Sequence, residues 1–227
     1  RGLINVQFAV RDGEVVVLEA NPRASRTVRF VAKATGVPLV KVASRVMVGA
    51  TLAELREEGL LNEASTEGHV AVKEAVLPFN RFPDADRVLG PEMRSTGEVM
   101  GIDRSFGLAF AKSQMAAGDR LPESGTVFFS LADRDKPNGI RAAERYVALG
   151  FDIVATAGTA DALEEAGVPV LRRLAKLADS TGGVPTAVDL IRAGEIQMVV
   201  NSPRGRGPRA DGGYIRAAAG VAGIPCL

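Results

Sequence analysis

The chain has 227 residues, 46% of them hydrophobic, which is enough to bury the core of one or two domains. Its 28 basic residues nearly balance its 27 acidic residues, and the net charge of +1 gives no global attraction for nucleic acid or for an anionic membrane surface. No apolar run approaches the roughly 20 residues that span a bilayer, and a single cysteine cannot form an internal disulfide, so we expect a cytoplasmic protein without membrane or nucleic-acid partners.

An opening β-hairpin is predicted from two β-rich runs, residues 4–10 and 15–20, on either side of Arg11-Asp12-Gly13-Glu14. A three-residue loop with Gly13 in the left-handed conformation would place Gln7 directly across from Glu19, whereas a two-residue loop would break this grouping. Three helices are expected next: one at 26–35, one beginning after Pro38, and a short one that begins at a capping box of Thr51 and Glu54. Strands at 70–77 and 97–102 and a helix at 106–117 are expected to follow.

Strands and helices alternate from Thr126 onward, which is typical of a parallel, doubly wound α/β sheet. The expected strands are 127–131, 151–155, 168–171 and 196–200, and the expected helices are 139–149, 159–166, 186–193 and 214–222. Residues 224–227 would begin a fifth strand, so we expect the chain to be cut at this end, as at its first residues. The basic segment 204–209 has no interleaved aromatic residues and is predicted to be a solvated loop.

A first group of polar residues lies at the end of the predicted hairpin. Glu19 and Asn21 are two apart on an extended backbone, so both side chains point to one face. With Gln7 they would offer the oxygen ligands that suit Mg²⁺ bound to substrate phosphates. Arg23 and Arg26 follow within a turn, and guanidinium groups suit phosphate oxygens. The pattern fits phosphoryl transfer, and a hairpin with a solvated polar face is the alternative.

A second group of polar residues is predicted at the carboxyl-end edge of the later sheet. Thr156-Ala157-Gly158-Thr159 lies where a strand ends and a helix begins, so its hydroxyls and free amides can bind a phosphate. Asn201 ends another predicted strand and Lys136 precedes the first helix of this part, and such sheets bind ligands at this edge. An ordinary turn of an α/β protein is the alternative.

The strings Asn5-Val6-Gln7-Phe8-Ala9 and residues 19–27 resemble the closing motif of ATP-grasp ligases of the carbamoyl phosphate synthetase type. Residues 72–79 and 90–101 resemble the segment after the second ATP-grasp unit of the large subunit, and the stretch from Thr126 resembles the methylglyoxal-synthase-like fold. The resemblance therefore implies an α/β chain of two parts. Residues 1–118 would be the C-terminal part of the carbamate-phosphorylating ATP-grasp domain, and residues 119–227 a methylglyoxal-synthase-like allosteric domain.

The resemblance also implies roles for individual residues. In that family the residues matching Gln7, Glu19 and Asn21 hold Mg²⁺ or Mn²⁺ on the ATP phosphates, which makes Gln7 and Glu19 ATP-binding as well. The matching arginines, Arg23 and Arg26, contact phosphate groups. Regulatory nucleotides such as UMP and IMP would be bound by Lys136, Thr156, Thr159, Lys176 and Asn201, and the activator ornithine by Glu74, while Pro203 stands where another effector-binding threonine is expected.

As a whole, a protein of that family makes carbamoyl phosphate for arginine and pyrimidines from bicarbonate, two ATP and ammonia delivered by a glutaminase small subunit. K⁺ is a further candidate cofactor, and a homo-oligomer is expected. The 227-residue chain alone is expected to be inactive, because the portion that grips adenine and ribose is missing. The alternatives are a non-catalytic regulatory subunit from a split gene and a free-standing methylglyoxal-synthase-like nucleotide-binding protein.

Overall fold

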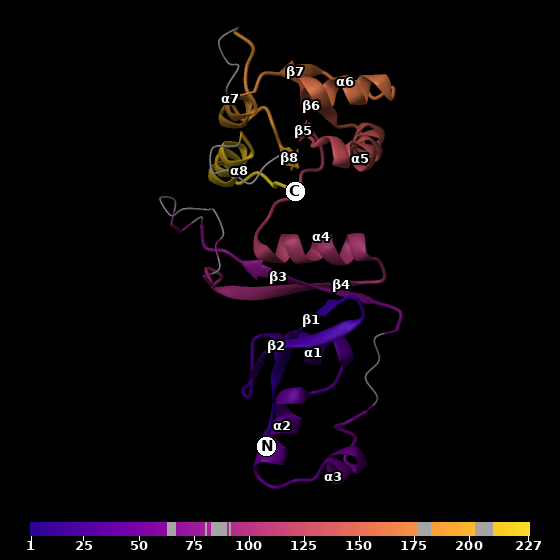
Figure 1. Cartoon of the computed structure of the whole chain (residues 1–227), viewed down its shortest axis with the longest axis vertical. Coiled ribbons are helices and arrows are strands. Elements are labelled where there is room, and N and C mark those ends of the chain that lie inside the picture. The colour runs from indigo at the N-terminus through magenta and orange to yellow at the C-terminus, as the bar shows by residue number, and fades with distance from the viewer. Residues whose placement is uncertain (63–66, 80, 83–89, 91, 177–182, 203–210) are drawn as a thin grey trace. The chain divides into compact units, whose positions relative to one another are not determined.

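The structure is a computed structural model that describes residues 1–62, 67–79, 81–82, 90, 92–176, 183–202 and 211–227 (Figure 1). Pro203 and the basic segment 204–209 therefore lie outside the described residues. The chain divides into two compact units, and the first consists of Arg1–Ala75 with Gly97–Ala116. The second unit consists of Val76–Thr96 with Ala117–Leu227.

The first unit begins with the predicted antiparallel hairpin and continues with short helices. Gly36 takes a left-handed conformation (φ 73°) directly after the first helix, and the Thr51–Glu54 capping box starts the third, as predicted. The elements are β1 (Asn5–Arg11), β2 (Glu14–Asn21), α1 (Thr27–Thr35), α2 (Leu39–Met47), α3 (Leu52–Glu57), the paired strands β3 (Val70–Val76) and β4 (Gly97–Asp103), and α4 (Phe106–Ala117).

Helix α4 packs against β4 through a very close backbone approach at Gly101. A Cβ atom at this position would lie 1.9 Å from the Ala109 carbonyl oxygen and 2.6 Å from the Ser113 backbone nitrogen. Gly101, Ala109 and Ser113 are all buried. Glycine is therefore required here by contact and not by an unusual backbone angle.

Gly101→Ala is expected to destabilise the first unit by about 3 kcal/mol or more, because backbone atoms cannot move aside as a flexible side chain can. Thermal unfolding of the purified protein measures the effect. Gly107→Ala on α4 is the matched control, since a Cβ atom there meets no other atom within 4 Å. Equal melting temperatures for the two variants would contradict the close contact.

The second unit is the predicted parallel sheet with helices on both faces. Its strands follow the order β7-β6-β5-β8, and all pairs are parallel. In Figure 1, α5 and α6 lie on one side of this sheet and α7 and α8 on the other. Cys226 bridges Val199 in parallel beyond β8, as expected for a further strand. The elements are β5 (Thr126–Ser130), a 3₁₀ turn (Asp133–Asp135), α5 (Lys136–Ala148), β6 (Asp152–Thr156), α6 (Ala157–Glu165), β7 (Arg172–Leu174), α7 (Ala187–Arg192), β8 (Met198–Asn201) and α8 (Asp211–Ala222).

The prediction of a strand at 168–171 is wrong, because the strand lies at Arg172–Leu174 instead. Gly167 has a left-handed backbone and Val168, 3% exposed, donates its N–H to the Leu163 carbonyl, so this apolar run closes the end of α6. The edge strand is formed by the charged residues after it. There Arg173 pairs with Asp161 and Glu164 of α6, which holds β7 in place.

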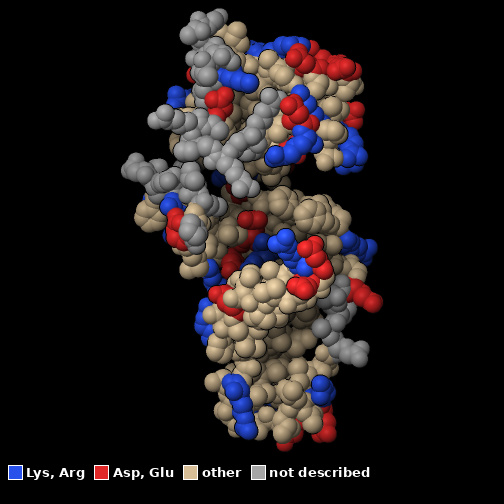
Figure 2. All heavy atoms as spheres, viewed as in Figure 1, with Lys and Arg blue, Asp and Glu red and all other residues tan. Residues whose placement is uncertain are grey.

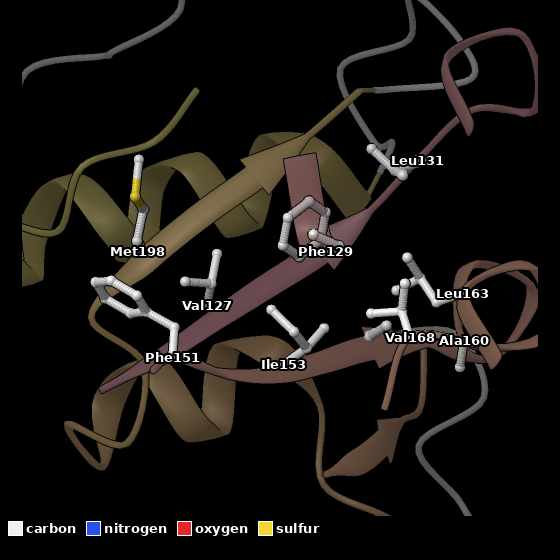
Figure 3. Close-up of a cluster of buried hydrophobic side chains, with 11 residues drawn as sticks. Val127, Phe129, Leu131, Phe151, Ile153, Ala160, Leu163, Val168 and Met198 are labelled. Atoms are coloured by element: carbon white, nitrogen blue, oxygen red, sulfur yellow. The ribbon is translucent and has the colours of Figure 1, made fainter. Parts of the chain in front are cut away.

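Two hydrophobic clusters lie on the two faces of this sheet. Figure 3 shows one of them, in which Val127 and Phe129 of β5 pack with Ile153 of β6 and Leu163 of α6. Phe128, between them on β5, points to the other cluster, as alternation along a strand requires. Because both faces are covered, the strands have near-continuous apolar sequences.

A capping box also starts α7, and it predicts a pH dependence. Hydrogen bonds from the Thr186 side chain and backbone N–H hold the pKa of Asp189 below its usual value. A carboxyl group whose pKa is lowered by folding stabilises the protein at pH values above its pKa in the unfolded chain. This stabilisation is lost as the pH falls through the pKa of the folded state. Asp189→Asn should therefore lower the melting temperature at neutral pH, and the difference from wild type should shrink below about pH 4. A difference that is constant with pH would contradict this account.

Candidate functional site

The hairpin brings the predicted metal ligands together, although by a different route from the predicted one. Its turn contains two residues, Asp12 (φ 52°) and Gly13 (φ 83°), so the expected three-residue loop is wrong. A β-bulge, however, shifts the register between Gln7 and Phe8, and Gln7 pairs with Glu19 after all. The expected grouping is therefore present because Leu18 is the extra residue of the bulge.

The same register places a fourth polar residue beside this group. Asn5 pairs with Asn21 and lies two residues from Gln7 on the same face. The spacing of two residues between Asn5 and Gln7 is the signal in the sequence that points to Asn5. The Asn21 amide nitrogen donates to Glu19 Oε1 at 2.9 Å. This bond uses the amide nitrogen and leaves the Asn21 amide oxygen as an acceptor toward a cation.

Carboxylate and amide oxygens on an exposed face suit a hard cation such as Mg²⁺ or Mn²⁺. Gln7 and Glu19 are exposed, and Asn21 is half-buried at the end of β2. Among the described residues, no group of three or more His, Cys, Asp and Glu side chains is placed to hold a metal. A metal at the hairpin would thus depend on one carboxylate, neighbouring amides and the phosphates of a substrate.

The two arginines follow the hairpin at the start of α1. Arg23 is exposed and its guanidinium donates to the Ala24 carbonyl at 3.4 Å. Arg26 directly precedes α1, whose first turn contains no acidic residue. Arg26 Nε lies 3.4 Å from Glu98 Oε1 on β4, a contact between residues far apart in the sequence that no local pattern predicts. A helix start with cationic side chains and no carboxylate in its first turn favours an anion such as phosphate.

Glu74 lies on β3 of the same unit, and its carboxylate is engaged by protein groups. The Gln114 side chain of α4 donates to Glu74 Oε2 at 3.0 Å, and the Ala75 N–H donates to Oε1 at 3.2 Å. The predicted ornithine ligand is thus half-buried between β3 and α4.

In the second unit, the loop that follows β5, beginning with Leu131 and Ala132, is hydrogen-bonded to the start of α6 and to the end of β8. The Leu131 N–H donates to Thr159 Oγ1 at 2.9 Å, and the Thr156 hydroxyl donates to the same oxygen at 3.3 Å. On the other side, the Ala132 N–H donates to Ser202 Oγ at 2.8 Å. Thr159 is only 2% exposed, and its hydroxyl stabilises the loop through the bond from Leu131.

Asn201 and Lys136 lie at the same edge of the sheet. Asn201 is the last residue of β8 and pairs with Ser130, the last residue of β5. Its Nδ2 is buried and has no hydrogen-bond partner among the described residues. Lys136 begins α5, and its ammonium group lies 2.8 Å from Asp133. Lys176 follows the carboxyl end of β7 and is exposed.

Charges elsewhere are mixed in sign. On the face drawn in Figure 2, the basic and acidic side chains of the described residues are interspersed over each unit. Within the described part of the chain, no helix is long and apolar enough to cross a membrane.

Comparisons with known proteins find matches for two parts of the chain. Residues 1–55 match the family model of the carbamoyl-phosphate synthase L chain, ATP binding domain, and residues 138–227 match that of the MGS-like domain. The carbamoyl phosphate synthase large chain of Mycobacterium tuberculosis (strain H37Rv) is 54% identical over all of this chain and 22% of its own length. Those of Clavibacter michiganensis and Beutenbergia cavernae are 56% and 57% identical over 96% and 100% of this chain.

The fold and the matches define the end of an ATP-binding domain of an ATP-dependent ligase, followed by an MGS-like domain. The chain belongs to the family of carbamoyl phosphate synthase large chains. It spans about a fifth of the length of the curated relatives it matches, 22% in the M. tuberculosis protein.

Proposed function

We propose that this chain is the part of a carbamoyl phosphate synthase that completes the second phosphorylation site and carries the regulatory domain. The whole protein would make carbamoyl phosphate from bicarbonate, two ATP and ammonia released from glutamine by a small subunit. The observation that carries the proposal is the hairpin register, which puts Gln7, Glu19 and Asn21 on one face just before Arg23 and Arg26.

At the hairpin, the residues would bind and orient the reacting phosphates. A divalent cation, Mg²⁺ or Mn²⁺, would neutralise phosphate charge during transfer from ATP to carbamate. Glu19 would supply the anionic ligand, and Gln7 and Asn21 would supply neutral amide oxygens. The Asn21 amide nitrogen, bonded to Glu19, holds both side chains in one orientation before the substrate arrives.

The two arginines would add positive charge to the site, opposite in sign to the phosphates. Arg23 and Arg26 would bind phosphate oxygens, with the start of α1 adding backbone N–H groups and the positive end of its dipole. A split-gene regulatory subunit would have no need of this full set of ligands, so the hairpin favours the catalytic assignment. The domain limits at 118 and 119, a cytoplasmic location, K⁺ binding and a homo-oligomer are parts of the same proposal.

In the second unit, the edge of the sheet between β5 and β8 would bind a regulatory nucleotide such as UMP or IMP. This edge lies where the strand order reverses, and open α/β sheets bind ligands there. Lys136 would attract the phosphate and Thr156 and Thr159 would surround it. The Asn201 Nδ2, which has no hydrogen-bond partner in the part of the chain that the structure describes, would donate to the nucleotide. Glu74 would bind ornithine once its bond to Gln114 is exchanged.

The test uses the full-length large chain with its small subunit, and the isolated 227-residue chain beside it. The full-length protein should form ATP from ADP and carbamoyl phosphate, and should make carbamoyl phosphate from glutamine, bicarbonate and ATP. The isolated chain should do neither. A full-length protein without the ADP-dependent reaction would reject the proposal, and so would an active isolated chain.

A further inference from the structure

A carboxylate and two cations meet in the first unit, beside the arginines that follow the hairpin. Arg26 Nε lies 3.4 Å from Glu98 Oε1, and Lys73 Nζ lies 3.4 Å from Glu98 Oε2. Lys73 also donates to the Thr27 hydroxyl at 3.2 Å. These residues come from the start of α1, from β3 and from β4, which are far apart in the sequence.

Glu98 has the least exposed side chain of these three charged residues. Its side chain is 19% exposed, against 42% for Arg26 and 36% for Lys73. Its Oε2 is buried and makes no hydrogen bond within the described residues, so its charge is balanced mainly by the two neighbouring cations. Removing a carboxylate from water is unfavourable, and exposed ion pairs add little stability. The contribution of these ion pairs to the stability of the fold is therefore a weak explanation for a carboxylate at this position.

A carboxylate also repels phosphate, so Glu98 is unsuited to bind the phosphate that the neighbouring arginine would hold. It is suited to hold the arginine itself. Its 3.4 Å contact is with Nε, the guanidinium nitrogen nearest the main chain. Because a guanidinium is planar, fixing Nε fixes the direction of the two terminal nitrogens.

We propose that Glu98 is a positioning residue that orients Arg26 toward the phosphate, with Lys73 holding the other carboxylate oxygen. Lys73 in turn contacts Thr27, the first residue of α1, so the orientation is fixed relative to the helix start. The cluster keeps a net charge of +1, which favours an incoming anion. The proposal rests on the proposed function, since it takes Arg26 as a phosphate ligand.

The test is a double-mutant cycle in the full-length large chain with its small subunit. ATP formation from ADP and carbamoyl phosphate is measured for wild type, Glu98→Gln, Arg26→Ala and the double variant. Arg26→Ala should lower kcat/KM for carbamoyl phosphate by about 10²-fold, and Glu98→Gln by about tenfold. The double variant should be no worse than Arg26→Ala alone, within about twofold, because Glu98 acts through Arg26.

The matched control is Glu58→Gln, which removes the carboxylate of another arginine pair, that with Arg45, in the same unit. It should leave the rate unchanged. If Glu98→Gln does not accumulate as folded protein, Glu98→Asp carries the same cycle and should retain more activity than Glu98→Ala. If the losses in kcat/KM of the two single variants add up in the double variant, the positioning role of Glu98 is overturned. The same holds if Arg26→Ala is impaired while Glu98→Gln has the wild-type rate. Neither result would contradict the phosphate role of Arg26. A normal Arg26→Ala would overturn the phosphate role of Arg26 together with the positioning role.

Discussion

Replacing Glu19 with glutamine in the full-length protein should lower ATP formation from carbamoyl phosphate and ADP by about 10²-fold or more. The substitution keeps the size of the side chain and an oxygen toward the cation, but removes the only carboxylate of the Asn5, Gln7, Glu19 and Asn21 group. A divalent cation without that charge is held less firmly and neutralises the phosphates less well. Asn21→Ala should act in the same direction, since it removes a ligand oxygen and the bond that orients Glu19.

Glu14→Gln is the control for this substitution. Glu14 lies on the same hairpin and is exposed, but it pairs with Arg11 beside the turn and away from the predicted ligands. The rate should therefore stay at the wild-type value. Raising the Mn²⁺ concentration should recover part of the Glu19→Gln activity if the defect is weak metal binding. Equal rates for the Glu14 and Glu19 variants would reject the metal site.

Removing two phosphate contacts from the second unit should abolish the response to UMP or IMP at micromolar concentrations. Lys136→Met takes away the charge and Thr156→Val takes away a hydroxyl, with little change in shape. Each charge-assisted bond contributes roughly 1.5–3 kcal/mol, so the two together should weaken binding by about 10²-fold to 10⁴-fold. Thr159 is left intact, because its hydroxyl accepts the Leu131 N–H and its loss would disturb the loop.

Calorimetry with each nucleotide on wild type and on the double variant measures this effect. Arg145→Met is the matched control, because Arg145 lies on the last turn of α5, whereas Lys136 lies on the first. Synthesis without any nucleotide should be measured beside it. Unchanged affinity in the double variant would place the effector elsewhere, and a loss of synthesis without nucleotide would assign Lys136 to catalysis. Because coupling between sites is reciprocal, the double variant should also lose any effect of substrates on nucleotide affinity.

Local signals in the sequence predicted most helices correctly. Helix α4 has the predicted bounds, and the Thr51–Glu54 capping box starts α3, because these features depend on residues a few positions apart. The parallel sheet was also predicted, since alternating strands and helices leave few other topologies. The strand at Arg172–Leu174 was not, because Arg173 is held by ion pairs with α6 and Arg172 by one with Glu195, and hydrophobic patterning does not reveal such pairs.

The sites were predictable to the extent that their residues are close in sequence. Glu19 and Asn21 share a face because they are two apart, and Thr156 and Thr159 share one turn. The bulge at Leu18 was not predictable, because the turn Asp12-Gly13 fits more than one register. The contact of Glu98 with Arg26 was not predictable either, since it depends on how β4 lies against the start of α1.

The β-bulge also separates the hairpin into two parts that can be engineered independently. Between Phe8 and Val17 the strands follow one register, and beyond Leu18 they follow another. The ligand face is therefore aligned by the bulge and not by the length of the hairpin tip. Because hydrogen-bonded and non-hydrogen-bonded pairs alternate along an antiparallel hairpin, the tip can be shortened by two cross-strand pairs and closed again with the same two-residue turn, and Gln7 should then still face Glu19.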